Sequence, residues 1–209
     1  MFETKLRTKI SGMLVPLATT IASLGITANT VTLLGLFVNL IAAFCLATGR
    51  LVLGGILILF GGSFDMMDGA VARAKATNNS SGALLDSVID RYAEAVVFFG
   101  ALIYFYHLPN LLGVLLVFAS VIGSILVSYV RARAEGLQIE CKVGLMQRPE
   151  RIVLLALGVL AQGLLPARFE SLRSDGLILV SVFGILAVTS HITAIHRLIF
   201  SFYELSDHH

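Results

Sequence analysis

Six long apolar runs most constrain what this chain can fold into. They fall near residues 29–49, 51–73, 82–106, 110–133, 149–165 and 176–199. A helix needs about 20 apolar residues to cross the hydrocarbon core of a bilayer, and the fifth run is at the short limit. Only 13% of the 209 residues are charged, whereas a soluble domain has about 25%. We therefore expect an all-α, polytopic membrane protein with six transmembrane helices.

The first 25 residues have a different character from the apolar runs. Lys5, Arg7 and Lys9 precede apolar positions that recur at helical spacing. This pattern predicts an N-terminal interfacial amphipathic helix over residues 1–25, and the alternative is a basic N-terminus that serves only to orient the chain. We expect the six-helix membrane domain to cover residues 26–203, followed by a C-terminal tail over 204–209.

The basic residues are distributed unevenly between the two ends of the predicted helices. With six spans, Arg50, Arg168 and Arg173 fall on one side, and the remaining 12 of the 15 lysines and arginines fall on the side of the N-terminus. Cytoplasmic loops carry the excess of Lys and Arg. We therefore expect a multi-pass protein of the cell membrane with a cytoplasmic N-terminus.

Four aspartates interrupt the second and third apolar runs. Asp65 and Asp68 are three residues apart, and Asp86 and Asp90 are four apart. Either spacing places two carboxylates on one face of a helix. An ionisable group at membrane depth costs several kcal/mol and usually marks a functional site. Four carboxylates repel one another unless cations neutralise them, and hard oxygen ligands suit Mg²⁺ or Mn²⁺.

The segment between these aspartates has features suited to a phosphorylated ligand. Gly69 and Gly82 leave room for a ligand to approach the backbone, and Ala72 is small for the same reason. Arg73 lies one turn beyond Asp68 or Gly69, where its guanidinium could bind phosphate oxygens.

Carboxylates, a metal and an arginine are the groups that phosphoryl transfer requires. One carboxylate can also accept the proton of an attacking hydroxyl. Asp90 is the best candidate for this general base, because it is the last acid on its helix face and lies one turn beyond Asp86.

Residues 65–90 read D-x2-D-G-x2-A-R-x8-G-x3-D-x3-D and resemble the signature of the CDP-alcohol phosphotransferase family. The match holds at every fixed position: Asp65, Asp68, Gly69, Ala72, Arg73, Gly82, Asp86 and Asp90. The resemblance implies a six-helix membrane fold, usually dimeric, with a cytoplasmic active site. A CDP-linked lipid gives its phosphatidyl group to an alcohol, and CMP is released. In the family the first three aspartates, helped by the fourth, hold two divalent ions, and the fourth is the general base.

Three further segments resemble the prokaryotic phosphatidylinositol-phosphate synthase branch of this family. They are GITANTVTLLG at 25–35, SYVRARAEG at 128–136 and QRPER at 147–151. The resemblance implies CDP-diacylglycerol as donor and inositol phosphate as acceptor. It also implies nucleotide contacts from the loop before the first span and from the connector after the second, through Thr27, Ala28, Asn29, Thr30 and Asn79. With Asp68, Gly69, Ala72, Arg73 and Gly82, these residues form the expected CDP-lipid site.

Five basic residues near the fourth and fifth runs are candidates for binding the phosphate of the acceptor: Arg131, Arg133, Lys142, Arg148 and Arg151. Each of them could instead serve only to orient the chain in the membrane. Five cations around one loop exceed what orientation needs, and they suit a doubly charged phosphate.

Two other enzymes and one other class of protein are the alternatives. Phosphatidylglycerophosphate synthase also uses a phosphorylated acceptor, and a related archaeal branch, archaetidylinositol-phosphate synthase, uses a CDP-archaeol donor. A cation transporter lined by carboxylates is the alternative outside enzymes. Transporters often show inverted repeats and midplane sites, whereas these acids gather at one end of their runs. We expect small-molecule substrates, membrane lipids and a second copy of the chain as partners, and no nucleic acid.

Overall fold

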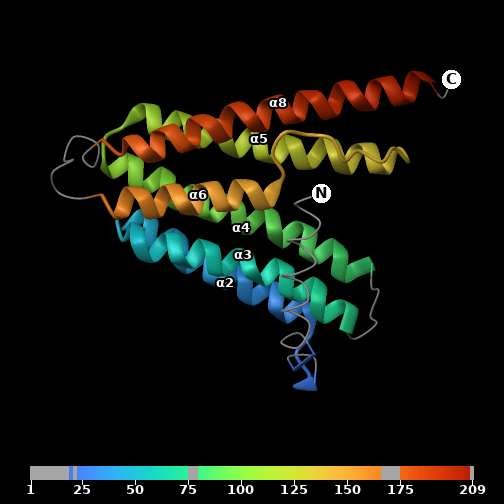
Figure 1. The fold of residues 1–209 in the computed structure, drawn as a ribbon, viewed down its shortest axis with the longest axis horizontal. Coiled ribbons are helices and arrows are strands. Elements are labelled where there is room, and N and C mark those ends of the chain that lie inside the picture. The colour runs from blue at the N-terminus through green and yellow to red at the C-terminus, as the bar shows by residue number, and fades with distance from the viewer. Residues whose placement is uncertain (1–18, 21–22, 75–79, 166–174, 208–209) are drawn as a thin grey trace.

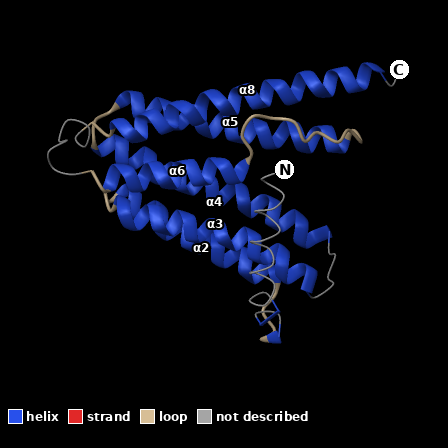
Figure 2. Cartoon of the chain, in the orientation of Figure 1, coloured by secondary structure: helices blue, strands red, loops and turns tan. Residues whose placement is uncertain are grey.

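Six helices make up most of the described part of the chain in the computed structural model, which covers residues 19–20, 23–74, 80–165 and 175–207. Figure 2 shows helices and loops, with no strand in these residues. The helices are α2 (Ala28–Ala47), α3 (Leu51–Ala74), α4 (Ser80–His107), α5 (Leu111–Gly136), α6 (Arg148–Gly163) and α8 (Leu177–Asp207).

Local sequence sets several of the helix ends. Thr27 caps α2, since its hydroxyl accepts a hydrogen bond from the Thr30 amide at 3.3 Å. Asn110 caps α5 in the same way, accepting from the Gly113 amide at 2.9 Å. Both residue types are favoured N-caps because they satisfy free amides of the first turn. Gly49 follows α2 with φ of +75°, the left-handed conformation that commonly follows the end of a helix.

The all-helical class is confirmed, and each predicted apolar run coincides with one helix. Four described helices are long and apolar enough to cross a membrane: α2, Leu51–Arg73 of α3, α5, and Leu177–Ser206 of α8. The other two fall short for visible reasons, because α6 has 16 residues and α4 carries four charged residues, Asp86, Asp90, Arg91 and Glu94. The count of six spans therefore stays a prediction.

The predictions for the two ends of the chain can be compared with the structure only in part. Most of the predicted interfacial helix over residues 1–25 lies outside the described residues. At the other end, α8 continues as a helix to Asp207, so the predicted tail over 204–209 begins as part of that helix.

The helices alternate in direction, which brings distant segments to one end of the bundle. The N-terminal ends of α2, α4 and α6 and the C-terminal ends of α3, α5 and α8 lie at the right of Figure 1. α2 packs against α3 and α4, α6 packs against α3 and α8, and α5 packs against α4 and α8. This topology places residues 65–74, 80–90 and 147–151 at the same end.

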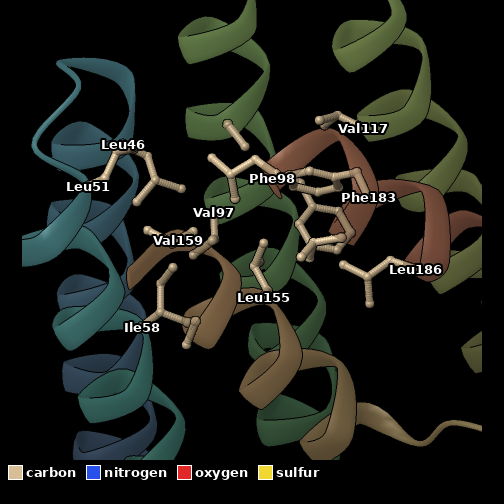
Figure 3. Close-up of a cluster of buried hydrophobic side chains, with 14 of the residues drawn as sticks. Leu46, Leu51, Ile58, Val97, Phe98, Val117, Leu155, Val159, Phe183 and Leu186 are labelled. Carbon is tan, nitrogen blue, oxygen red and sulfur yellow. The ribbon is translucent and has the colours of Figure 1, made fainter. Parts of the chain in front are cut away.

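An apolar core fixes the positions of the helices relative to one another. Phe98 of α4 and Phe183 of α8 meet edge to face, with ring centroids 5.5 Å apart. Leu155 and Val159 of α6 and Leu46 of α2 complete this core (Figure 3). Many large apolar side chains face outward instead, among them Leu115, Phe118 and Ile125 of α5. An outward apolar surface of this extent suits a lipid environment.

Gly100 allows α4 to approach α2 at backbone distance. A Cβ at this position would lie 2.4 Å from the carbonyl oxygen of Ala43, far inside van der Waals contact. Gly184 of α8 is different, because a Cβ there would lie 3.9 Å from its nearest neighbour, Leu116 Cδ1, an ordinary van der Waals distance. Small residues at helix crossings are typical of membrane bundles.

Replacing Gly100 by valine is expected to destabilise the bundle. The helices must separate to admit the side chain, and overpacking of this kind costs about 1–3 kcal/mol. Thermal unfolding in detergent should show a clearly lower midpoint for Gly100→Val than for the parent protein. Gly184→Ala is the matched control and should keep or slightly raise the midpoint. Equal midpoints for Gly100→Val and the parent would contradict the close approach.

Candidate active site

Two of the four aspartates face each other across one arginine. Asp65 lies on α3 and Asp90 on α4, and both helices pack on α2. Arg148, the first residue of α6, donates through Nη1 to Asp65 Oδ2 and to Asp90 Oδ2, the latter at 2.6 Å. Its Nη2 also donates to the backbone carbonyl of Asp90 at 3.2 Å. The start of α6 is thus tied to both acid-bearing helices.

The other two aspartates have different surroundings. Asp68 is 5% exposed and accepts a hydrogen bond from the Thr32 hydroxyl at 2.8 Å. Asp86 lies within electrostatic range of Asp65, Asp68 and Asp90. Its Oδ1 is buried and has no hydrogen-bond partner among the described residues. A buried oxygen of this kind calls for a partner, and a cation would supply one.

The donor set fits a hard divalent cation. All four candidate ligands are carboxylates, and oxygen ligands suit Mg²⁺ or Mn²⁺. Within the described residues no three acidic, histidine or cysteine side chains are arranged to enclose an ion. Arg148 contacts Oδ2 of both Asp65 and Asp90. A cation bound by these two carboxylates would compete with Arg148 for their oxygens.

The residues expected to contact the CDP-lipid gather around the starts of α2 and α4. A Cβ on Gly82 would lie 3.2 Å from Asn29 Oδ1, so this glycine lets the two helix starts lie side by side. Thr27 and Thr30 share a hydrogen bond between their hydroxyls at 2.9 Å, and Ala28 is the first residue of α2. Asn79 lies outside the described residues.

The end of α3 carries the other residues of this group. Arg73 is exposed in the last turn of α3, with Ala72 beside it in the chain. The guanidinium of Arg73 extends back along the helix, because a Cβ on Gly69 would lie 3.3 Å from Arg73 Nη1. Arg73 and Gly69 therefore share one patch of the helix surface, one turn from Asp68.

A cavity of about 390 Å³ opens beside the aspartates. Its walls come from α4, α5, α6 and α8 and carry both acids and bases: Asp86, Asp90, Arg91, Arg131, Glu135, Arg148, Arg151 and Arg197. The structure thus brings three of the five predicted acceptor residues to one cavity, and that cavity has Asp86 and Asp90 on its wall.

Arg133 and Lys142 are not brought to this cavity. Arg133 lies two residues after Arg131, about 200° around the helix, so the two side chains leave α5 in different directions. Lys142 lies on an exposed loop and donates to Glu140, which lowers the pKa of that carboxyl. The sequence shows that these cations share one end of the bundle, but it does not show which way each side chain points.

Two buried charged residues were not identified from the sequence: Arg197, which lines this cavity, and Glu94, which pairs with the cavity residue Arg151. Arg197 of α8 is buried and donates at 2.8 Å to the carbonyls of Val143 and Val127. Glu94 of α4 is buried against Arg151. Both positions carry a charge inside an apolar run, which is the available signal. Glu94 also continues the four-residue spacing of Asp86 and Asp90.

Comparison with known proteins identifies one family. The model of the CDP-alcohol phosphatidyltransferase family matches residues 25–196. The chain is 35% identical over 178 residues to an archaetidylinositol phosphate synthase of Methanothermobacter thermautotrophicus, covering 85% of this chain and 84% of the relative. It is 36% identical over 152 residues to a phosphatidylinositol phosphate synthase of Mycobacteroides abscessus, covering 71% and 68%.

Solved structures show the same fold. The crystal structure of Mycobacterium tuberculosis phosphatidylinositol phosphate synthase with CDP-DAG bound superposes with a TM-score of 0.79 at 29% identity, covering 90% of this chain and 93% of that chain. A second structure of that protein, in complex with manganese and citrate, gives a TM-score of 0.77 and covers 90% and 88%. A divalent metal is therefore consistent with this fold.

Replacing Asp86 by asparagine is expected to weaken Mn²⁺ binding by about tenfold or more. Loss even of a residue that only supports a metal ligand typically lowers metal affinity by about this factor. The substitution keeps the shape of the side chain and removes its charge. Free Mn²⁺ can be measured by electron paramagnetic resonance during titration of the purified protein. Glu140→Gln, which alters an exposed loop carboxylate, should bind Mn²⁺ as the parent protein does. Unchanged binding by Asp86→Asn would exclude Asp86 as a ligand.

Proposed function

The chain belongs to the CDP-alcohol phosphatidyltransferase family, and on that premise we propose that it transfers the phosphatidyl group of CDP-diacylglycerol to inositol phosphate. The products are phosphatidylinositol phosphate and CMP. The observation that carries this proposal is the 390 Å³ cavity, whose lining includes the acids Asp86 and Asp90 together with Arg131, Arg148 and Arg151. A hydroxyl of the acceptor can meet the acids of this cavity while its phosphate meets the arginines.

We propose a membrane arrangement that suits these substrates. All six helices span or enter the bilayer of the cell membrane, and the end of the bundle that carries the aspartates faces the cytoplasm. The basic residues support this orientation, since most of them belong to the same end. The lipid tails of the donor stay in the bilayer while the water-soluble acceptor enters the cavity. A homodimer is part of the proposal through the family resemblance alone.

The donor is held at the starts of α2 and α4 and the end of α3. We assign to it Thr27, Ala28, Asn29, Thr30, Asp68, Gly69, Ala72, Arg73, Asn79 and Gly82. The close approach of Gly82 to Asn29 supports this assignment, because it brings the starts of α2 and α4 together while Asn29 stays exposed. Arg73 would pair with the donor diphosphate, for which a guanidinium is well suited.

We assign the cation site to Asp65, Asp68 and Asp86, with help from Asp90, and we propose two ions of Mg²⁺ or Mn²⁺. Bound there, divalent ions would neutralise the donor diphosphate and stabilise the charge on departing CMP. Thr32 orients Asp68 through its hydrogen bond of 2.8 Å. The unpartnered Oδ1 of Asp86 supports a ligand role for that residue.

Asp90 is the proposed general base. Its side chain is on the wall of the cavity and is held by Arg148 at 2.6 Å. Asp90 takes the proton of the attacking hydroxyl, whose oxygen forms a bond to the β-phosphorus of the donor. The bond from that phosphorus to the bridging oxygen breaks, and CMP leaves with the electron pair. Arg148 contacts the carboxylates and also lines the cavity, so its side chain can turn from the carboxylates to the phosphate of the acceptor.

The similarity to an archaetidylinositol phosphate synthase favours one second candidate. In that case the acceptor and its site are the same, and the donor is CDP-archaeol. Purified protein should be assayed with both donors and with inositol phosphate, glycerol 3-phosphate and free inositol as acceptors. We expect lipid product from inositol phosphate and none from free inositol. Product from glycerol 3-phosphate but not from inositol phosphate would overturn the proposed acceptor.

Asp90→Asn is expected to lose at least about a hundredfold in turnover, as removal of a general base usually does. The asparagine cannot take a proton, and most of the proposed ligands for the cation remain. Binding of the CDP-lipid should persist and can be measured by fluorescence with a labelled donor. Loss of donor binding together with turnover would instead assign Asp90 to the donor site.

Arg131→Ala is expected to raise the KM for inositol phosphate by about tenfold, since a hydrogen bond to a charged group is worth about 1.5–3 kcal/mol. The KM for the donor should change little. Arg133→Ala is the matched control, because it removes the same charge two residues further along α5 and outside the cavity. Similar KM values for the two variants would indicate that both arginines serve only to orient the chain in the membrane.

A further inference from the structure

A buried network of three side chains joins three helices beside the cavity. Glu94 of α4 accepts from Arg151 Nε at 2.9 Å and from Arg151 Nη2 at 3.2 Å. It also accepts from the hydroxyl of Ser124, on α5, at 2.6 Å. The Ser124 oxygen in turn accepts from Arg151 Nη2 at 3.2 Å. Glu94 is 9% exposed, Ser124 4% and Arg151 2%.

The pairing of Glu94 with Arg151 leaves one end of the guanidinium uncommitted. Glu94 takes the edge formed by Nε and Nη2, which is a two-point contact with fixed geometry. Nη1 of Arg151 is buried and has no hydrogen-bond partner among the described residues. Nε of Arg148 is in the same condition. A buried donor without a partner is costly, so both groups call for an acceptor.

The two uncommitted donors belong to arginines that line the same cavity. Arg148 and Arg151 are three residues apart on α6, so their side chains lie on one face of the helix. Both residues line the 390 Å³ cavity, and both also border a smaller cavity of about 20 Å³. A phosphate offers several oxygens and could accept from both arginines.

We propose that Glu94 and Ser124 are positioning residues that hold Arg151 with its free N–H groups directed at the phosphate of the acceptor. This inference rests on the proposed function, because it assumes that the phosphate of the acceptor alcohol binds in the cavity. Glu94 itself does not touch the substrate, since its carboxylate is taken up by Arg151 and Ser124 and would repel a phosphate. Its position one turn beyond Asp90 links the base and the phosphate site through the rigid body of α4.

The opposite prediction follows if Glu94 acts only through its charge. A negative charge beside Arg151 weakens the attraction of the cavity for a phosphate. Removing that charge would then lower the KM for the acceptor. If Glu94 instead fixes the orientation of Arg151, removing the charge frees the guanidinium and raises the KM. The sign of the change therefore separates the two roles.

Glu94→Gln is the first test, with the KM for acceptor and donor, kcat, and the thermal midpoint measured on purified protein. We expect the acceptor KM to rise about tenfold while the donor KM stays within about twofold. Titration calorimetry with inositol phosphate should show the same loss of affinity without turnover. An unchanged or lower acceptor KM, or equal rises in both KM values, would overturn the positioning role.

Ser124→Ala and Ser120→Ala form a matched pair that does not depend on the folding of Glu94→Gln. Both serines are buried on α5 one turn apart, but the Ser120 hydroxyl donates to the carbonyls of Leu116 and Phe183, away from Arg151. Ser124→Ala should raise the acceptor KM by about threefold to tenfold, and Ser120→Ala should leave it unchanged. Equal KM values for the two variants would also overturn the proposal.

Failure of the proposed function would look different. If the parent protein uses another phosphorylated alcohol, the acceptor assignment is wrong, and the same comparison of KM values is made with that alcohol. The positioning role fails only when an active parent protein and the variants have the same KM for a phosphorylated acceptor.

Discussion

The balance of charge at one end of an apolar bundle is the constraint on which the site depends. Asp65 and Asp90 share Arg148, and Glu94 pairs with Arg151. Burying a carboxylate without a partner is far more costly than burying a paired one. Both arginines come from the first turn of α6, so this one helix supplies counter-ions to two others. The position of α6 and the electrostatics of the site are therefore set together.

The apolar core and the close helix contacts make this balance possible. Phe98 and Phe183 fix α4 against α8, and Gly100 lets α4 lie on the backbone of α2. Phe98 and Gly100 follow Asp90 on the same helix, so these contacts hold the acid-bearing α4 against α8 and α2. A rigid scaffold of this kind can hold polar groups at defined distances, because packed interiors yield little to strain. The cavity is thus a consequence of the packing around it.

The polar groups of the site divide into two sets with different partners. Asp68 and Asp86 lie toward the start of α2, where Thr32 donates to Asp68. Arg151 and Glu94 lie deeper in the bundle, where Ser124 completes their network. Arg148 contacts Asp65 and Asp90 and also borders the cavity. This arrangement lets the same end of the bundle receive a nucleotide-linked lipid and a soluble phosphate.

The sequence by itself determined the six helices, the shared faces of the aspartate pairs and the family signature, because these follow from spacing of a few residues along one helix. It did not show which cations meet which acids. Arg151 meets Glu94 across 57 positions and Arg148 meets Asp65 across 83, so these pairings depend on how helices pack. The same holds for the roles of Thr32, Ser124 and Arg197, because each of these side chains forms a hydrogen bond with a residue on another helix. Local periodicity fixes which face a residue occupies, and only the tertiary structure decides what that face meets.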